Sequence, residues 1–204
     1  MERLGGGVLA AVEVTSLDNL LASLRPSGPL PTYFPPLDAL CAKHRAATLS
    51  PTLSISGRPA PLIYALVSRL AGLNYALLVV DFEGWFDASR LVCADEHLHH
   101  VYVMQDEDPC ADLFNINSTH HGQQQDFYTR QIPPAPKIRA AAHQCMLRAA
   151  AASRHRQWWG EIVIGAEPAA GHVVVPPGRS RGWLRVERRG EAWLAHSEWG
   201  SFLF

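Results

Sequence analysis

One segment of the sequence, Tyr75–Asp81, limits the possible folds more than any other. It reads Tyr-Ala-Leu-Leu-Val-Val-Asp, with five consecutive apolar residues. An apolar run of this length without alternation is typical of a strand buried on both faces of a parallel sheet. Before it, Thr52–Gly57 alternates apolar and polar residues, and Leu62–Leu73 places leucines along one side of a helix. Strand, helix and buried strand in this order predict an α/β protein with a mostly parallel sheet.

The same periodicities predict further elements on both sides of this unit. Helices are expected over residues 17–24, 37–47, 87–95 and 138–155. Strands are expected over 101–104, 161–164 and 173–175, and a C-terminal β-hairpin over 182–187 and 191–195. Five prolines exclude regular structure from Arg25–Pro36, and 105–136 is expected to be a loop. The division that follows is an N-terminal helical and Pro-rich segment, 1–49, and an α/β core, 50–204.

Composition narrows the classes to which the chain can belong. Its 204 residues fit one domain, and 48% hydrophobic against 18% charged residues argue against a largely disordered chain. The four cysteines form no metal-binding pattern, so we expect reduced thiols in a nuclear or cytoplasmic protein. The longest apolar run, Ala76–Val80, is far shorter than the roughly 20 residues of a membrane span, so no membrane partner is expected.

The net charge of −1 hides an uneven distribution. Residues 1–136 carry 8 Lys and Arg against 14 Asp and Glu, whereas 137–189 carry 10 against 3. A basic region of this kind can follow a phosphate backbone, or it can be a solvated face that pairs with the acidic half of this or another subunit. Its densest part supplies the candidate DNA-binding residues: Arg179, Arg181, Arg185, Arg188 and Arg189.

The turn between the first strand and its helix lies where P-loop proteins bind phosphate. A working loop needs Gly-x-x-x-x-Gly-Lys-Ser/Thr, but the chain has Gly57-Arg58-Pro59-Ala60-Pro61-Leu62, with neither the Lys nor the hydroxyl. Its two prolines also remove N–H donors from the phosphate cradle. Gly57 and Arg58 are therefore interpreted as a degenerate phosphate loop, with an ordinary strand-to-helix turn as the alternative.

Two carboxylates follow the buried strand. Asp81 and Glu83 flank Phe82 at the carboxyl end of the strand, where open α/β sheets bind ligands. In this position they can hold magnesium or orient a water molecule. The alternative is that Asp81 caps the following turn and that Glu83 is solvated.

These residues resemble the core of eukaryotic RecA-type recombinases and their paralogues. In that family a P-loop and its helix lead to a strand that ends in the motif D-T-E-G-x-F-x-x-x-R-L. The residues that match this motif position by position are Asp81, Glu83, Gly84, Phe86, Arg90 and Leu91. Small X-ray-repair cross-complementing-type paralogues, fungal ones above all, also resemble the chain in a closing Trp-Gly-x-Phe, here Trp199–Phe202. The resemblance covers residues 50–104 and, more weakly, 156–204.

The resemblance implies a RecA-like P-loop NTPase fold, abbreviated, with a C-terminal β-hairpin. It also implies a nuclear, non-catalytic subunit of a recombinase-paralogue complex in homologous recombination, with other paralogues and DNA as partners. Gly57, Arg58, Asp81 and Glu83 would then be a vestigial nucleotide site without a catalytic residue or a bound cofactor. The alternatives are a weak ATPase that uses ATP and magnesium, and an inactive RecA-fold scaffold of another complex, such as a tRNA-modification assembly.

The chain departs from the family pattern at a second place besides the phosphate loop. The Walker B strand, four apolar residues before an aspartate, is not recognisable between Met104 and Lys137. A central strand of the family fold is therefore missing from this stretch, so either the sequence here is incomplete or the sheet is rebuilt. In active members of the family, the glutamate at the position of Glu83 assists ATP hydrolysis.

Two other groups of residues, the histidines of 97–100 and the tryptophans, can be interpreted either as functional or as structural. His97, His99 and His100, with Asp95 and Glu96, are candidate metal ligands, but their spacing matches no known site. The tryptophans at 158, 159, 183, 193 and 199 can stack on bases, although core packing is the more frequent role of such residues. No metal site is predicted.

Overall fold

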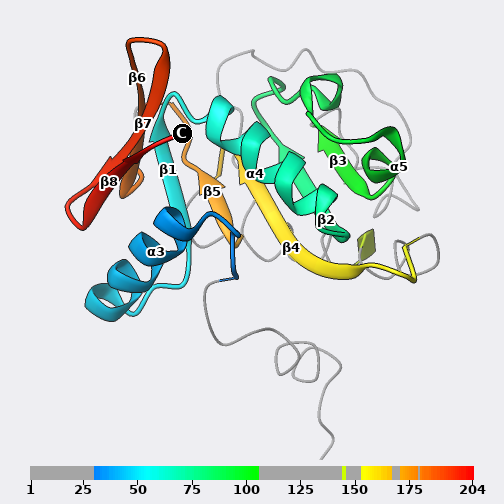
Figure 1. Ribbon diagram of the computed structural model, residues 1–204, viewed down its shortest axis with the longest axis horizontal. Helices are drawn as coiled ribbons and strands as arrows, with labels where there is room; N and C mark the ends of the chain where they lie inside the picture. The colour runs from blue at the N-terminus through cyan, green and yellow to red at the C-terminus, as the bar shows by residue number, and fades with distance from the viewer. Residues whose placement is uncertain (1–29, 106–143, 146–152, 167–170, 179) are drawn as a thin grey trace, which may run out of the picture.

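The computed structural model describes residues 30–105, 144–145, 153–166, 171–178 and 180–204. The chain is an α/β protein built on an eight-stranded sheet of order β3-β2-β4-β5-β1-β6-β7-β8 (Figure 1). Strands β1 to β6 run parallel, β7 is antiparallel to β6, and β8 is antiparallel to β7. The predicted class and the mostly parallel sheet are confirmed.

The elements follow the predicted order along the chain. The strands are β1 (Leu53–Gly57), β2 (Tyr75–Asp81), β3 (Val101–Gln105), β4 (Gln157–Ile164), β5 (Val173–Val175), β6 (Leu184–Arg189), β7 (Ala192–Ser197) and β8 (Gly200–Leu203). The helices are α3 (Pro35–Thr48), α4 (Ala60–Gly72), the single 3-10 turn η1 (Ala88–Arg90) and the one-turn α5 (Asp95–Leu98).

Strand β2 is buried on both faces, as its apolar run predicts. Leu77 and Val79 belong to the main core, together with the apolar sides of α3 and α4. Leu78 and Val80 face a second, smaller cluster, against which Cys145 packs. Because successive side chains of a strand point to opposite faces, an uninterrupted apolar sequence is what this position requires.

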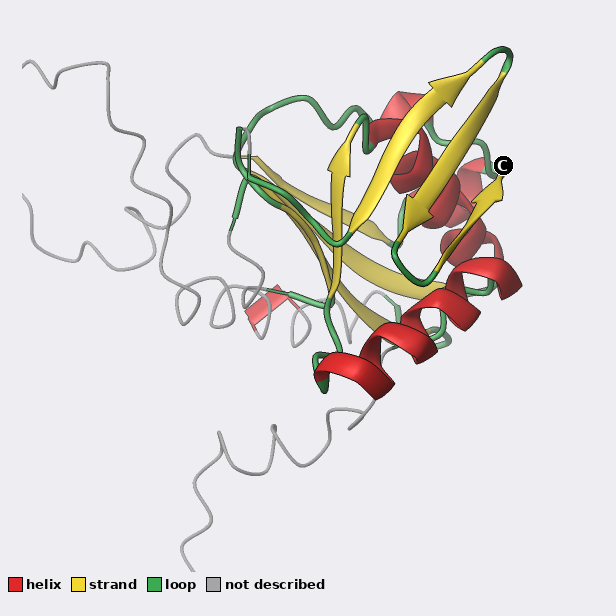
Figure 2. Ribbon diagram, turned by 90° about the vertical axis from the view of Figure 1, so that its left-hand side faces the viewer, coloured by secondary structure: helices red, strands yellow, loops and turns green. Residues whose placement is uncertain are grey.

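Helix α3 packs beside β8, and α4 lies across the strands of the same sheet (Figures 1 and 2). Pro35 and Pro36 occupy the first turn of α3, where a missing N–H removes no helical hydrogen bond, so the irregular segment ends earlier than predicted. The segment Leu30–Phe34 is irregular. Thr32 fastens it to α3, because its N–H and its hydroxyl both donate to Oδ1 of Asp38, each over 2.7 Å.

The helix predicted over 87–95 is wrong. The chain forms η1 there, with Oδ1 of Asp87 accepting the Ser89 N–H over 2.9 Å, and α5 begins only at Asp95. Between these elements, the Val92 N–H donates to Oγ of Ser68 in α4 over 2.9 Å. A hydrogen bond to another helix therefore replaces the i to i−4 backbone hydrogen bond that a helix would need here.

The helix predicted over 138–155 is seen at Gln144–Cys145, whereas Ser153–Arg156 forms a turn closed by an N–H···O bond of 2.9 Å. The rest of that segment, together with 17–24 and 106–136, lies outside the described residues. The predicted hairpin is present as β6 and β7, and the sheet continues into β8, which the sequence patterns did not predict.

The stretch between Met104 and Lys137, where the Walker B strand is not recognisable, lies outside the described residues from 106 onward. Strand β4 lies between β2 and β5 and pairs with both in parallel, so the described strands form one continuous sheet. A bulge between Ala76 and Leu77 in the β2–β4 register admits Trp159 beside Trp158, and Trp159 packs in the main core. Within the described residues, no helix has the length and apolar character that crossing a membrane would take.

Candidate functional site

A cavity of about 400 Å³ that is open to solvent lies at the carboxyl ends of β1, β2 and β5. This volume is in the range of small-molecule sites, and the position is the one at which open α/β sheets bind ligands. The cavity is lined by the β1–α4 turn, the turn after β2 and the segment after β5: Ser56, Gly57, Arg58, Pro59, Ala60, Glu83, Trp85, Val175, Pro176, Gly178 and Ser180.

The turn from β1 into α4 packs directly against the backbone of β6. Gly57 has a φ of +85°, and a Cβ there would lie 2.4 Å from the carbonyl oxygen of Val186, so the position requires glycine. The next N–H, that of Arg58, donates to the same oxygen over 2.8 Å. Helix α4 then starts after Pro59 without a side-chain cap.

This geometry leaves few donors for an anion. The N–H of Arg58 is already used by Val186, and Pro59 and Pro61 have none. A phosphate cradle needs several adjacent N–H groups that converge on one point. The turn is therefore built as a short connection between strand and helix, and it offers little to a polyphosphate.

The carboxylate of Asp81 is fully buried and serves its own turn. Oδ1 accepts the N–H groups of Glu83 and Gly84 over 3.0 and 2.9 Å, and Oδ2 accepts that of Phe86 over 2.6 Å. Three backbone donors on two oxygens are the arrangement of a cap that orders a tight turn. Asp81 therefore caps the turn, as the alternative interpretation had it, and its oxygens are not directed at a ligand shared with Glu83.

Glu83 is exposed and lines the cavity. Its Oε2 accepts the indole N–H of Trp85 over 3.0 Å, which holds the carboxylate beside an aromatic wall. Gly165, directly after β4, makes room for it, because a Cβ there would lie 2.9 Å from Cγ of Glu83. Strand β4 ends in three apolar residues, Ile162–Ile164, and Gly165 follows directly, so no carboxylate stands at that position.

Arg58 lies at the rim of the same cavity and is exposed. Within the described residues, its guanidinium makes no hydrogen bond or ion pair. The structure thus brings Gly57, Arg58 and Glu83 to one cavity and directs Asp81 into a turn beside it. The sequence patterns missed Trp85 and Gly165, although a glycine directly after an apolar strand was a visible signal.

The candidate DNA-binding arginines do not form one patch. Arg185 and Arg189 lie on one face of β6 with Glu187, and Arg188 lies on the opposite face with Val186, because a strand alternates its side chains. The side chains of all three arginines are exposed, as is that of Arg181. Arg179 lies outside the described residues.

Glu187 reduces the positive charge of this face. Its carboxylate is 3.8 Å from Nε of Arg185 and 3.7 Å from Nε2 of His196 on β7. On the opposite face, Nε of Arg188 donates to the Gly190 carbonyl in the hairpin turn over 3.1 Å. Arg189 is the residue on β6 whose positive charge has no partner within the described residues.

Three of the tryptophans, Trp159, Trp183 and Trp199, have structural roles. The indole N–H groups of Trp159 and Trp183 donate to the backbone carbonyls of Pro31 and Thr52, over 2.8 and 2.9 Å. Trp183 stacks on the buried His44 at 4.3 Å between ring centroids, and Trp199 meets the same imidazole edge-on. Among the described residues, no three His, Cys, Asp or Glu side chains are placed to hold a metal ion together.

Comparison of the chain with protein-family models, with curated proteins and with solved structures found no match in any of the three.

Proposed function

We propose that the chain is a non-catalytic RecA-like paralogue that acts in double-strand break repair by homologous recombination, as a subunit of a recombinase-paralogue complex. The resemblance of residues 81–91 to the family motif supports this proposal. The mostly parallel eight-stranded sheet, with a helix directly after β1 and an antiparallel extension after β6, is compatible with a RecA-like core.

One observation carries the non-catalytic part of the proposal: a cavity lies where a nucleotide would bind, but among the described residues the groups that ATP hydrolysis needs are absent or engaged. The β1–α4 turn has two prolines and an N–H already bound to Val186. Asp81 is committed to three backbone donors. Gly165 supplies no carboxylate at the end of β4. Without a phosphate cradle and a metal ligand, Glu83 has no reactive group to act on.

The role that remains for such a subunit is to bind other proteins. We expect a hetero-oligomer with other RecA-type paralogues in the nucleus, in which the chain helps to load the recombinase without turning over ATP. DNA contact through the arginines of β6 belongs to the same proposal, because Arg185 and Arg189 lie on one exposed face.

Titration of the purified chain with magnesium-ATP tests the non-catalytic part. The expected result is no saturable binding and no phosphate release, both for the natural chain and for the matched variant Glu83→Gln. If the natural chain binds and hydrolyses ATP, and Glu83→Gln keeps the binding but loses the turnover, the weak-ATPase alternative is correct.

Co-purification of a tagged full chain from cells tests the repair part. Recovery with recombinase paralogues is the expected result. Recovery with a tRNA-modifying assembly instead would replace the repair proposal by the scaffold alternative, while the absence of ATP turnover would hold for both.

A further inference from the structure

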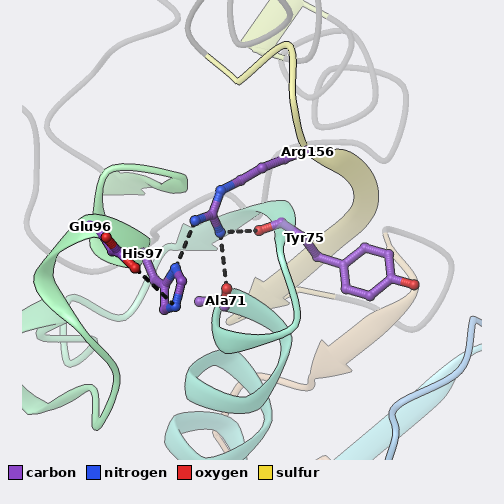
Figure 3. A network of polar contacts seen from close by, with 5 residues as sticks. All are labelled: Ala71, Tyr75, Glu96, His97 and Arg156. Atoms are coloured by element: carbon purple, nitrogen blue, oxygen red, sulfur yellow. Dashed lines mark hydrogen bonds and ion pairs between the residues drawn. The ribbon is translucent and has the colours of Figure 1, made fainter.

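Arg156 joins several parts of the fold through its guanidinium group (Figure 3). Nη1 donates to the carbonyl oxygens of Ala71, in the last turn of α4, over 2.9 Å, and of Tyr75, at the start of β2, over 3.4 Å. Nη2 lies 2.7 Å from Nδ1 of His97 in α5. Because Arg156 stands directly before β4, one side chain ties the start of the central strand to α4, β2 and α5.

The contact with Arg156 determines the hydrogen-bonding role of Nδ1 of His97. A guanidinium has donors and no acceptor, and it stays charged at all pH values at which proteins fold. Nδ1 of His97 must therefore accept the hydrogen bond and carry no proton. A proton on Nδ1 would place two donors and two positive charges 2.7 Å apart, which breaks the contact.

A second histidine, which directly precedes the edge strand β3, holds the same turn. The buried His100 has its Nδ1 2.7 Å from Oγ of Ser153, the first residue of the turn. The same Oγ lies 2.8 Å from the hydroxyl of Tyr102 on β3. The imidazole of His155 meets that of His100 edge-on at 5.0 Å between centroids.

Most groups that titrate around this turn become positive in acid. The groups that can carry charge are Arg154, Arg156, His97, His99, His100 and His155, with Cys93, Asp95, Glu96 and Tyr102 as the potential anions. Burial, and then the positive charges of Arg156 and the other histidines, lower the pKa of His100. The nearest acid, Glu96, is 79% exposed and its carboxylate is 3.9 Å from Nε2 of His97, so solvent screens it. Burial raises the pKa of the Cys93 thiol, which therefore stays neutral in acid.

We propose that Arg156, His97 and His100 form an acid-sensitive lock on the turn Ser153–Arg156. With neutral imidazoles, the lock holds this turn against α4, α5 and β3. When the imidazoles take up protons, the Arg156–His97 contact is lost, like charges gather around Arg156, and the turn opens. Because β4 begins directly after the turn, opening loosens the amino end of the strand that carries Gly165 at its other end. This inference does not depend on the proposed repair function.

Amide hydrogen exchange on the full chain tests the lock, at about pH 7.5 and about pH 5.5, on either side of the ordinary histidine titration. After correction for the intrinsic exchange rate at each pH, the opening equilibrium of amides from 153 to 160 should rise about tenfold in acid, the factor expected when one hydrogen bond to a charged group is lost. In His97→Gln the rise should be much smaller, because the glutamine oxygen accepts from Arg156 and does not titrate. His99→Gln is the matched control, because His99 is exposed and its ring makes no hydrogen bond within the described residues, and it should behave as the natural chain.

Equal acid-induced opening in the natural chain and in His97→Gln would overturn the lock. If His97→Gln does not fold, nitrogen NMR of the natural chain decides the question. An unprotonated Nδ1 on His97 at about pH 7.5 is required, and a proton found on that atom would disprove the proposal.

Discussion

At the residue scale, the site depends on what a single carboxylate does. The sequence left two roles open for Asp81, a ligand for magnesium or a cap for the following turn. The structure gives it the second role, with three backbone N–H groups on its two oxygens and a buried side chain. Glu83, two residues later, is exposed in the cavity and contacts Trp85 instead. The two carboxylates thus differ in role because the backbone N–H groups of the following turn bind Asp81 and leave Glu83 exposed.

Asp81→Asn is predicted to destabilise the fold by about 2 kcal/mol, because an amide nitrogen would face a backbone N–H in a buried site. Urea unfolding of the two chains measures the difference. Glu83→Gln is the matched control and should stay within about 0.5 kcal/mol of the natural chain, since Glu83 is exposed. A stable Asp81→Asn chain would show that the carboxylate is not needed as a cap.

His44 gives a second prediction at this scale, because its imidazole is buried between Trp183 and Trp199. Burial lowers the pKa of His44 below its ordinary value of 6.5, although the Ser50 backbone and Glu198 act in the opposite direction. The unfolded chain therefore binds more protons than the folded one as the pH falls through the unfolded value, and stability decreases toward acid.

His44→Phe retains a ring between the two tryptophans and removes the titration. Between about pH 7 and about pH 5, the free energy of unfolding of the natural chain should fall more than that of His44→Phe. Urea unfolding at each pH measures both slopes. Parallel slopes would mean that His44 does not contribute to the acid sensitivity.

At the element scale, the alternation of β6 determines how a basic sequence is displayed. Arginines that are adjacent in the sequence, Arg188 and Arg189, point to opposite faces of the strand. Arg185 shares its face with Arg189, but Glu187 lies between them and approaches Arg185 within 3.8 Å. A partner that binds one face of β6 therefore contacts less positive charge than the number of arginines in the sequence indicates.

The double variant Arg185→Ala, Arg189→Ala is predicted to weaken binding to duplex DNA at low salt and to lower the salt dependence by about two phosphate contacts. Arg188→Ala removes the same type of side chain from the other face and should have a much smaller effect. Electrophoretic shift or fluorescence titration at several salt concentrations distinguishes the three chains. If the natural chain shows no DNA binding at low salt, this face does not contact DNA.

At the scale of the whole molecule, α3 belongs to the same core as the sheet. Leu37 and Leu40 lie in the main cluster with residues of α4, β1 and β6, and a Cβ at Gly200 of β8 would lie 3.1 Å from Leu40. The sequence assigned α3 to an N-terminal segment, 1–49, separate from the core at 50–204. Because α3 covers part of the sheet, a chain that starts at residue 50 would expose apolar surface of the core.

Leu37→Ala is accordingly predicted to cost about 3 kcal/mol, the usual effect of removing a fully buried leucine. The control is Leu49→Ala, directly after the same helix, where the leucine is 85% exposed and the effect should be below about 0.5 kcal/mol. Thermal or urea unfolding compares the two variants. Equal effects would mean that α3 is not docked on the sheet.

Much of the candidate site followed from the sequence, because the carboxyl ends of parallel strands meet at one edge. Gly57 and Arg58 after β1 and Glu83 after β2 do line one cavity. Trp85 and Gly165 were missed, since their roles depend on which side chains approach them from other strands. The 87–95 segment was predicted wrongly because Ser68, on α4, takes the N–H of Val92.

The sequence by itself determined the βαβ unit, the buried strand Tyr75–Asp81 and the C-terminal hairpin. These elements rest on periodicity and on turn residues, which are properties of a few neighbouring positions. The tertiary structure decided that β4 completes the sheet between β2 and β5, that β8 extends it, and that Asp81 is a cap instead of a ligand. The physical reason is competition for hydrogen-bond partners: which strand pairs with which, and which donor reaches a carboxylate first, depends on groups brought together from distant parts of the chain.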